Sequence, residues 1–157
     1  HNTVDKTVFK PTPSDFRERY GIGDRFMILG VASPWTERKG LSDFVRLAGE
    51  LNSHKYAIVL VGLSEKQIEA MPGGIVGLTR TDSQQELAGI YSTADVFFNP
   101  TVEDNYPTVN LEAEACGTPV VTYDTGGCRE TITSSASIVL HSFEEAALRF
   151  KDWEDFS

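Results

Sequence analysis

The sequence has no long apolar stretch and few basic residues. Its longest apolar run extends only from Tyr56 to Leu63, whereas a membrane-spanning helix needs about 20 apolar residues. The first residues carry no apolar segment either, so we expect no signal peptide, and a start at His1 suggests part of a longer chain. The sequence contains 14 Lys and Arg residues but 23 Asp and Glu residues, which gives a net charge of -9. This balance argues against a nucleic-acid-binding protein, which needs a basic face.

Cysteine and histidine are also scarce, and this excludes several kinds of catalytic site. The two cysteines, Cys116 and Cys128, have neither metal-site spacing nor a disulfide framework, so we expect reduced thiols. His54 and His141 lie at the ends of predicted elements, which makes a histidine-based triad improbable. There is no Asp-x-Asp motif, so no metal site is expected.

What the sequence does contain is a regular alternation of two patterns over 157 residues, a length that suits one domain. Helix-period segments, three of them opening with capping boxes at Ser64, Ser83 and Ser142, separate short runs rich in Val, Ile and Phe. The runs read as buried strands at 26–32, 56–61, 74–78, 95–99, 119–123 and 137–140. This alternation predicts an α/β fold with a Rossmann-like parallel sheet and helices on both faces. We assign it to residues 16–157, with residues 1–15 as an arm or interdomain linker.

Ligands of such sheets bind at the carboxyl ends of the strands, so the loops there are the candidate site. Arg38-Lys39-Gly40 follows the first strand and leads into a helix. A lysine beside a glycine at a helix start suits an anionic ligand, because the backbone can approach closely and the helix terminus adds positive charge. The alternative is a solvated basic pair.

The loop after the fourth strand leads through Pro107 into another predicted helix, at 109–116. Backbone amides around residues 106–109 would point into the crevice at the strand ends. Asp104 lies in the loop, and Glu112 shares a helix face with Thr108, whereas Glu114 points elsewhere. The alternative is that Asp104 only caps the helix and Glu112 is a surface acid.

Two glycine-containing turns complete this edge. Gly126-Gly127 follows the fifth strand and permits close approach of the backbone to a ligand, although a plain turn that needs glycine is equally consistent. The same two readings hold for Gly62 after the second strand.

Taken together, these loops resemble the C-terminal domain of the family-four, GT-B-fold retaining glycosyltransferases. The most specific part is the stretch from Asp104 through Glu112 to Ala113, which is similar to the family's E-x7-E motif, followed by Ala115-Cys116-Gly117-Thr118-Pro119. Lys39-Gly40 and Gly126-Gly127 occur in the family's order. The similarity extends over most of the chain, from about residue 26 to residue 132.

The resemblance implies a domain that binds a nucleotide-sugar donor, with UDP among the expected nucleotides. Lys39 would pair with the diphosphate, Glu112 with the ribose hydroxyls, and Asp104 would lie near the donor sugar. These three are the expected catalytic residues. Further donor contacts are implied for Arg38, Gly40, Gly62, Thr79, Arg80, Tyr106, Pro107, Thr108, Val109, Gly126 and Gly127. Two positions depart from the family: Asp104 replaces the usual Glu, and Pro34 stands where an Arg is common.

The expected reaction is transfer of a hexose from a nucleoside diphosphate sugar, with retention at the anomeric carbon, to a glycan or lipid-linked acceptor. No metal or other cofactor is implied. The acceptor would bind a missing N-terminal domain, so this chain alone is expected to be inactive. The resemblance implies a cytoplasmic location in polysaccharide biosynthesis and leaves open peripheral attachment to the inner membrane face through that missing domain.

Two other functions stay open at this point. An epimerase or phosphorylase of the same fold would need a catalytic histidine or cofactor lysine, and neither is evident. A non-catalytic α/β nucleotide-binding or interaction module is the alternative from a different class.

Overall fold

A single parallel sheet organises the computed structural model, which describes residues 4–102, 107–124, 128, 131–134 and 136–152. Within these residues the sheet has six strands in the order β3-β2-β1-β4-β5-β6, and every neighbouring pair is parallel. The strands are β1 (Phe26–Val31), β2 (Tyr56–Val61), β3 (Ile75–Leu78), β4 (Val96–Asn99), β5 (Val120–Tyr123) and β6 (Ile138–Leu140). The predicted Rossmann-like α/β fold is confirmed, and each predicted strand is present to within one residue at either end.

Helices connect the strands, and serine side chains begin three of them. Ser64 and Gln67 form a complete capping box. Ser83 and Ser142 each accept a hydrogen bond from the amide three residues further on, at 3.1 and 3.2 Å. The helices are α1 (Phe16–Arg19), the 3₁₀ turn η1 (Glu37–Lys39), α2 (Leu41–Glu50), α3 (Glu65–Ala70), α4 (Gln84–Thr93), α5 (Thr108–Ala115) and α6 (Phe143–Asp152).

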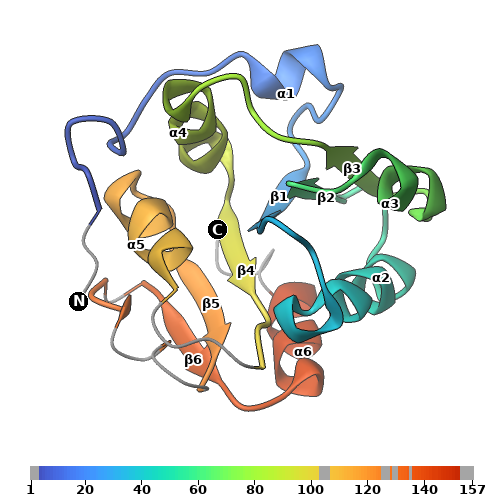
Figure 1. The fold of residues 1–157 in the computed structure, drawn as a ribbon. Helices are drawn as coiled ribbons and strands as arrows, with labels where there is room; N and C mark the ends of the chain where they lie inside the picture. The colour runs from blue at the N-terminus through green and yellow to red at the C-terminus, as the bar shows by residue number, and fades with distance from the viewer. Residues whose placement is uncertain (1–3, 103–106, 125–127, 129–130, 135, 153–157) are drawn as a thin grey trace.

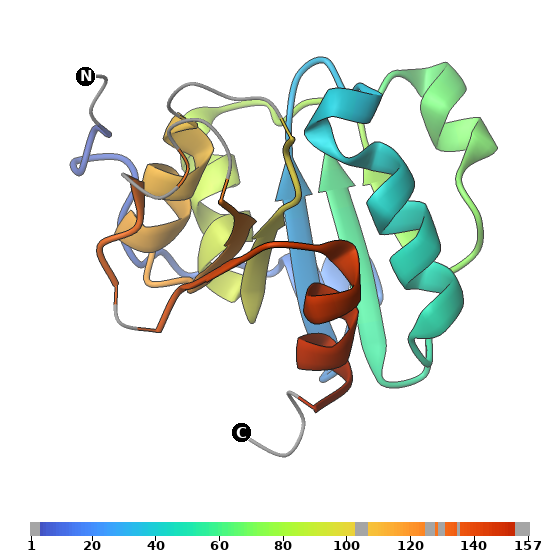
Figure 2. The ribbon, with the colours of Figure 1, turned by 90° about the horizontal axis from the view of Figure 1, so that it is seen from below.

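The helices cover both faces of the sheet, with α2 and α6 on one face and α4 and α5 on the other (Figures 1 and 2). Consecutive strand residues point to opposite faces, and β1 shows the result. Ile28 belongs to the hydrophobic cluster under α2 and α6, whereas Met27 and Leu29 belong to the cluster under α4 and α5. Because both faces are buried, the strands need continuous apolar runs rather than alternating ones.

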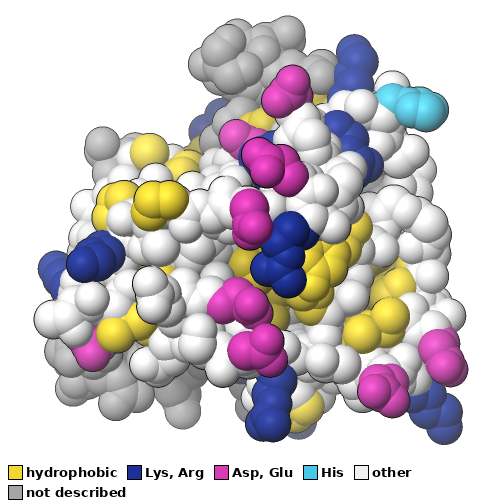
Figure 3. Space-filling view, turned by 90° about the horizontal axis from the view of Figure 1, so that it is seen from above, with side chains coloured by type: hydrophobic (Ala, Val, Ile, Leu, Met, Phe, Trp, Pro, Cys, Tyr) yellow, Lys and Arg dark blue, Asp and Glu magenta, His cyan; other side chains and the backbone are white. Residues whose placement is uncertain are grey.

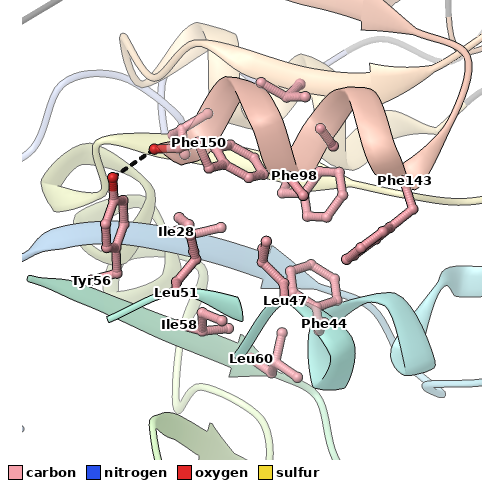
Figure 4. Packing of buried hydrophobic residues seen from close by; sticks show 14 of the residues in the cluster. Ile28, Phe44, Leu47, Leu51, Tyr56, Ile58, Leu60, Phe98, Phe143 and Phe150 are labelled. Atoms are coloured by element: carbon pink, nitrogen blue, oxygen red, sulfur yellow. Dashed lines mark hydrogen bonds between the residues drawn. The ribbon is translucent and has the colours of Figure 1, made fainter. Parts of the chain in front are cut away.

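Aromatic rings fill the core beneath α2 and α6 (Figure 4). Phe98 of β4 lies between Phe44 of α2 and Phe150 of α6, with ring centroids 5.1 Å apart in both pairs. The hydroxyl of Tyr56 donates a hydrogen bond of 2.7 Å to the main-chain oxygen of Phe150. This bond satisfies the polar end of a buried tyrosine and fixes the end of α6 against β2.

The N-terminal segment, residues 4–15, contains no helix or strand but packs along α4. Phe9 is only 3% exposed and belongs to the core under α4 and α5. The amide of Thr12 donates to the hydroxyl of Ser92, at 3.0 Å. None of the helices in the described part of the chain combines the length and the apolar character that a bilayer span requires.

Candidate functional site

A cavity of about 200 Å³ opens at the carboxyl ends of β1 and β4, the two central strands. From β1 the chain continues to β2 on one side, and from β4 it continues to β5 on the other. This is the topological switch point, where the loops of open α/β sheets diverge and ligands bind. The cavity is lined by Val31, Ala32, Ser33, Lys39, Asn99, Pro107, Thr108 and Val109.

Main-chain bonds hold the turn that carries Lys39 against the segment after β4. The main-chain oxygen of Arg38 accepts hydrogen bonds from the Val102 amide, at 2.9 Å, and from the Thr101 hydroxyl, at 3.1 Å. The following residue, Gly40, has a φ of 87°. A β-carbon on Gly40 would lie 2.6 Å from the main-chain oxygen of Pro100. Glycine therefore allows the two loops to meet, and this contact sets the position of Lys39 in the cavity wall.

The beginning of α5 also lines the cavity. Pro107 occupies the N-cap position, and among the described residues no side chain caps the helix. The first amides of an α-helix lack intrahelical acceptors, and the helix dipole adds partial positive charge there. Together with Lys39 they give the cavity the chemistry that binds phosphate groups.

Glu112, also predicted from the sequence, lies further along α5 and is not among the residues that line the cavity. It lies one turn beyond Thr108, on the same helix face, and its side chain is half-buried. The Tyr91 hydroxyl of α4 donates a hydrogen bond of 2.8 Å to its Oε1 atom. Burial raises the pKa of the Glu112 carboxyl, and the hydrogen bond from Tyr91 acts in the opposite direction. As anticipated, Glu114 points elsewhere: it accepts bonds from Thr133, Ser134 and Ser137.

A buried amide network lies beneath the cavity, and sequence reasoning did not single out its members. The side-chain Nδ2 of Asn99 donates a hydrogen bond of 3.0 Å to Oδ1 of Asn110. The side-chain Nδ2 of Asn110 in turn donates one of 3.0 Å to the Thr131 hydroxyl. Asn110 and Thr131 are completely buried. The network ties the end of β4 to α5 and to the segment after β5. The available signal was an asparagine at the end of an apolar strand, in a loop region already expected to bind ligand.

The remaining sequence-predicted residues fall into three groups. Gly62, Thr79 and Arg80 lie at the ends of β2 and β3, beside the cavity rather than in its wall. The Gly62 amide donates to the Thr79 main-chain oxygen, at 2.5 Å, and a β-carbon on Gly62 would lie 1.7 Å from the Ala32 oxygen. Arg38 contributes its main chain to the loop contact, and its side chain is exposed. Asp104, Tyr106, Gly126 and Gly127 lie outside the described residues.

A larger hollow, of about 550 Å³, lies between the N-terminal segment with α1 and the first half of α4. Its charged side chains are Asp15, Glu18, Arg19 and Glu86. Figure 3 shows how acidic side chains gather on this face around basic and hydrophobic ones. An acidic lining disfavours phosphate, so the smaller cavity at β1 and β4 is the better candidate for an anionic ligand.

The fold and the cavity define an α/β domain that presents a lysine and a helix N-terminus at the switch point of its sheet. Residues 25–150 match the model of the family described as glycosyl transferases group 1. This chain belongs to that family.

Sequence relatives are glycosyltransferases. The chain is 34% identical, over 148 residues, to the GDP-mannose-dependent alpha-(1-6)-phosphatidylinositol monomannoside mannosyltransferase of Mycolicibacterium smegmatis. That match covers 82% of this chain and 38% of the relative. A D-inositol 3-phosphate glycosyltransferase of Corynebacterium jeikeium is 29% identical, covering 88% of this chain and 36% of the relative. The chain thus spans less than two fifths of the length of both enzymes.

Solved structures show the same fold. HepE of Anabaena, crystallised in complex with UDP-glucose, superposes with a TM-score of 0.77 at 21% identity, over 99% of this chain and 47% of that one. The C-terminal domain of LpcC, a glycosyl transferase group 1 family protein of Francisella tularensis, gives 0.75 at 16% identity. The match covers 97% of this chain and 88% of the LpcC domain. The shared fold therefore extends over nearly the whole of this chain and most of the LpcC domain.

Proposed function

We propose that this chain is the donor-binding domain of a family-four retaining glycosyltransferase, which transfers a hexose from a nucleoside diphosphate sugar to a glycan or lipid-linked acceptor. The observation that carries the proposal is the cavity at β1 and β4, which is lined by both Lys39 and the N-terminus of α5, in a chain of the group 1 family. The named relatives and neighbours support a nucleotide-sugar ligand, since one is GDP-mannose-dependent and another was crystallised with UDP-glucose.

In this proposal the leaving diphosphate lies in the cavity. As the bond from the anomeric carbon to the diphosphate breaks, negative charge grows on the phosphate oxygens. Lys39 and the amides of Thr108 and Val109 are placed to stabilise it, and preorganised groups of this kind contribute strongly to catalysis. No protein nucleophile is needed for this role.

The proposal also includes the other donor contacts that the family resemblance implies. Glu112 accepts hydrogen bonds from the ribose hydroxyls, and Asp104, which is outside the described residues, contacts the donor sugar. Gly62, Thr79 and Arg80, at the ends of β2 and β3, flank the base and ribose. The acceptor binds a second domain beyond this chain, so the chain alone binds donor but does not transfer sugar.

Calorimetric titration with UDP and GDP tests the proposal through the variant Lys39→Ala. A charge-assisted hydrogen bond contributes about 1.5–3 kcal/mol, so the variant should bind the nucleoside diphosphate about ten- to a hundred-fold more weakly.

Lys151→Ala is the matched control. Lys151 forms an exposed ion pair with Glu50 at 3.1 Å, and both residues lie at the carboxyl ends of their helices, remote from the loops of the cavity. Its affinity should equal that of the wild type. Absence of nucleotide binding by the wild type would contradict the proposal and favour a non-catalytic interaction module.

A further inference from the structure

Tyr91 is a buried tyrosine whose position is fixed from several sides. Its side chain is fully buried. The ring meets Phe97 of β4 edge-on, at 5.5 Å, and Phe9 of the N-terminal segment at 6.1 Å. Its main-chain oxygen accepts a hydrogen bond from the Thr118 hydroxyl. Because these contacts restrain both the ring and the main chain of Tyr91, they also fix the position of its phenol oxygen.

The phenol group of Tyr91 forms a hydrogen bond with one of the two oxygens of the Glu112 carboxylate. It donates to Oε1 at 2.8 Å, and among the described residues no hydrogen bond to Oε2 is found. Glu112 is half-buried, so part of its side chain still meets solvent. In an α-helix, side chains lean toward the N-terminus, which for α5 is the end that lines the cavity at Thr108.

We propose that Tyr91 is a positioning residue for ribose recognition: by holding Oε1 of Glu112, it turns Oε2 toward the cavity to accept the ribose hydroxyls of the donor. This inference rests on the proposed function and extends it to a residue on another helix. Tyr91 itself does not touch the ligand.

The protonation states suit this role. Burial raises the pKa of Tyr91 well above its ordinary value, so the phenol keeps its proton and acts as the donor. The same hydrogen bond lowers the pKa of Glu112 against the effect of burial. It thereby favours an ionised carboxylate, which only accepts hydrogen bonds and so matches two ribose hydroxyls.

The test compares UDP and GDP with their 2′,3′-dideoxy analogues by calorimetric titration of the wild type and the variant Tyr91→Phe. The wild type should prefer the ribose form about tenfold or more, as expected for hydrogen bonds to a charged group. In Tyr91→Phe the affinity for UDP or GDP should fall toward that of the dideoxy form, whose own affinity should stay unchanged. A merely structural role would weaken both forms equally.

Tyr123→Phe is the matched control, because Tyr123 donates an equivalent bond of 2.8 Å to Asp43, between β5 and α2. It should keep the wild-type preference. The double variant Tyr91→Phe/Glu112→Ala should bind UDP no more weakly than Glu112→Ala alone, since Tyr91 acts through Glu112.

Two results would contradict the proposed role of Tyr91, and both can be distinguished from a result that contradicts the proposed function. One is a ribose preference that survives in Tyr91→Phe, and the other is additive losses in the double variant. If the wild type binds neither UDP nor GDP, the proposed function is wrong as well.

Discussion

At Glu112 the proposed function and the stability of the domain conflict. Burial raises the pKa of its carboxyl above the ordinary value of 4.5, so the folded protein holds this proton more tightly than the unfolded chain does. The protonated carboxyl therefore stabilises the fold at pH values below its pKa in the unfolded chain. This stabilisation is lost as the pH rises through its pKa in the folded protein. At neutral pH the ionised side chain therefore lowers the free energy of unfolding, a cost often found at functional sites.

The variant Glu112→Gln should show this cost directly. Glutamine keeps an oxygen that can accept from Tyr91 but carries no charge, so the variant should melt at a higher temperature than the wild type at pH 7. Near pH 4 the difference should shrink, because the wild-type carboxyl is then largely protonated. Thermal denaturation at both pH values measures the effect. The opposite result would be a variant that melts at a lower temperature than the wild type at pH 7, with a smaller difference near pH 4. It would mean that the fold stabilises the ionised form of the Glu112 carboxyl.

At the scale of residues, the sequence predicts several residues that line the cavity but not a contact between residues of different helices. Lys39, Pro107, Thr108 and Val109 were predicted as site residues because they follow strands or begin a helix, and they all line one cavity. The bond between Tyr91 and Glu112 joins two helices that are distant in sequence. Such a pair follows from packing rather than from spacing, so periodicity in the sequence does not predict it.

Among the secondary-structure elements, the strands and the helices that begin with a capping serine were predicted, whereas the short helices α1 and η1 were not. The strands follow from their apolar runs, and α3 and α4 from their capping serines. The four-residue helix α1 and the turn η1 are too short to show helical periodicity. The strand order was also not predictable in detail, since it depends on which neighbours pair across the sheet. That order is what brings the loops after β1 and β4 together.

The contact between those two loops depends on Gly40, and Gly40→Ala tests it. The added methyl group would lie 2.4 Å from the Pro100 side chain at a φ of 87°. We expect a loss of stability of about 1–3 kcal/mol, measured by urea denaturation, and weaker binding of UDP or GDP because Lys39 moves.

Gly49→Ala in α2 is the control for that experiment, since nothing lies within 4 Å of its added β-carbon. Alanine there should stabilise the helix by about 0.5–1 kcal/mol without changing nucleotide affinity. Equal stability changes in the two variants would show that the loops do not need a glycine at position 40.

For the whole molecule, the distribution of charge matters more than its sum. Residues 1–80 carry a net charge of +2 and residues 81–157 a net charge of -11. The basic half supplies Lys39, which lines the cavity at the start of α5, and the acidic half supplies Glu112, one turn further along that helix. An acidic protein can thus offer a local anion site, which its overall charge of -9 does not suggest.

We propose that a nucleoside diphosphate binds between the ends of β1 and β4, and backbone chemical-shift mapping with UDP and GDP locates its binding site. We predict the largest shifts at the amides of Lys39, Gly40, Thr108 and Val109, with α1 unaffected. Shifts centred instead on the acidic hollow beside α1 and α4, or no shifts at saturating nucleotide, would contradict the claim.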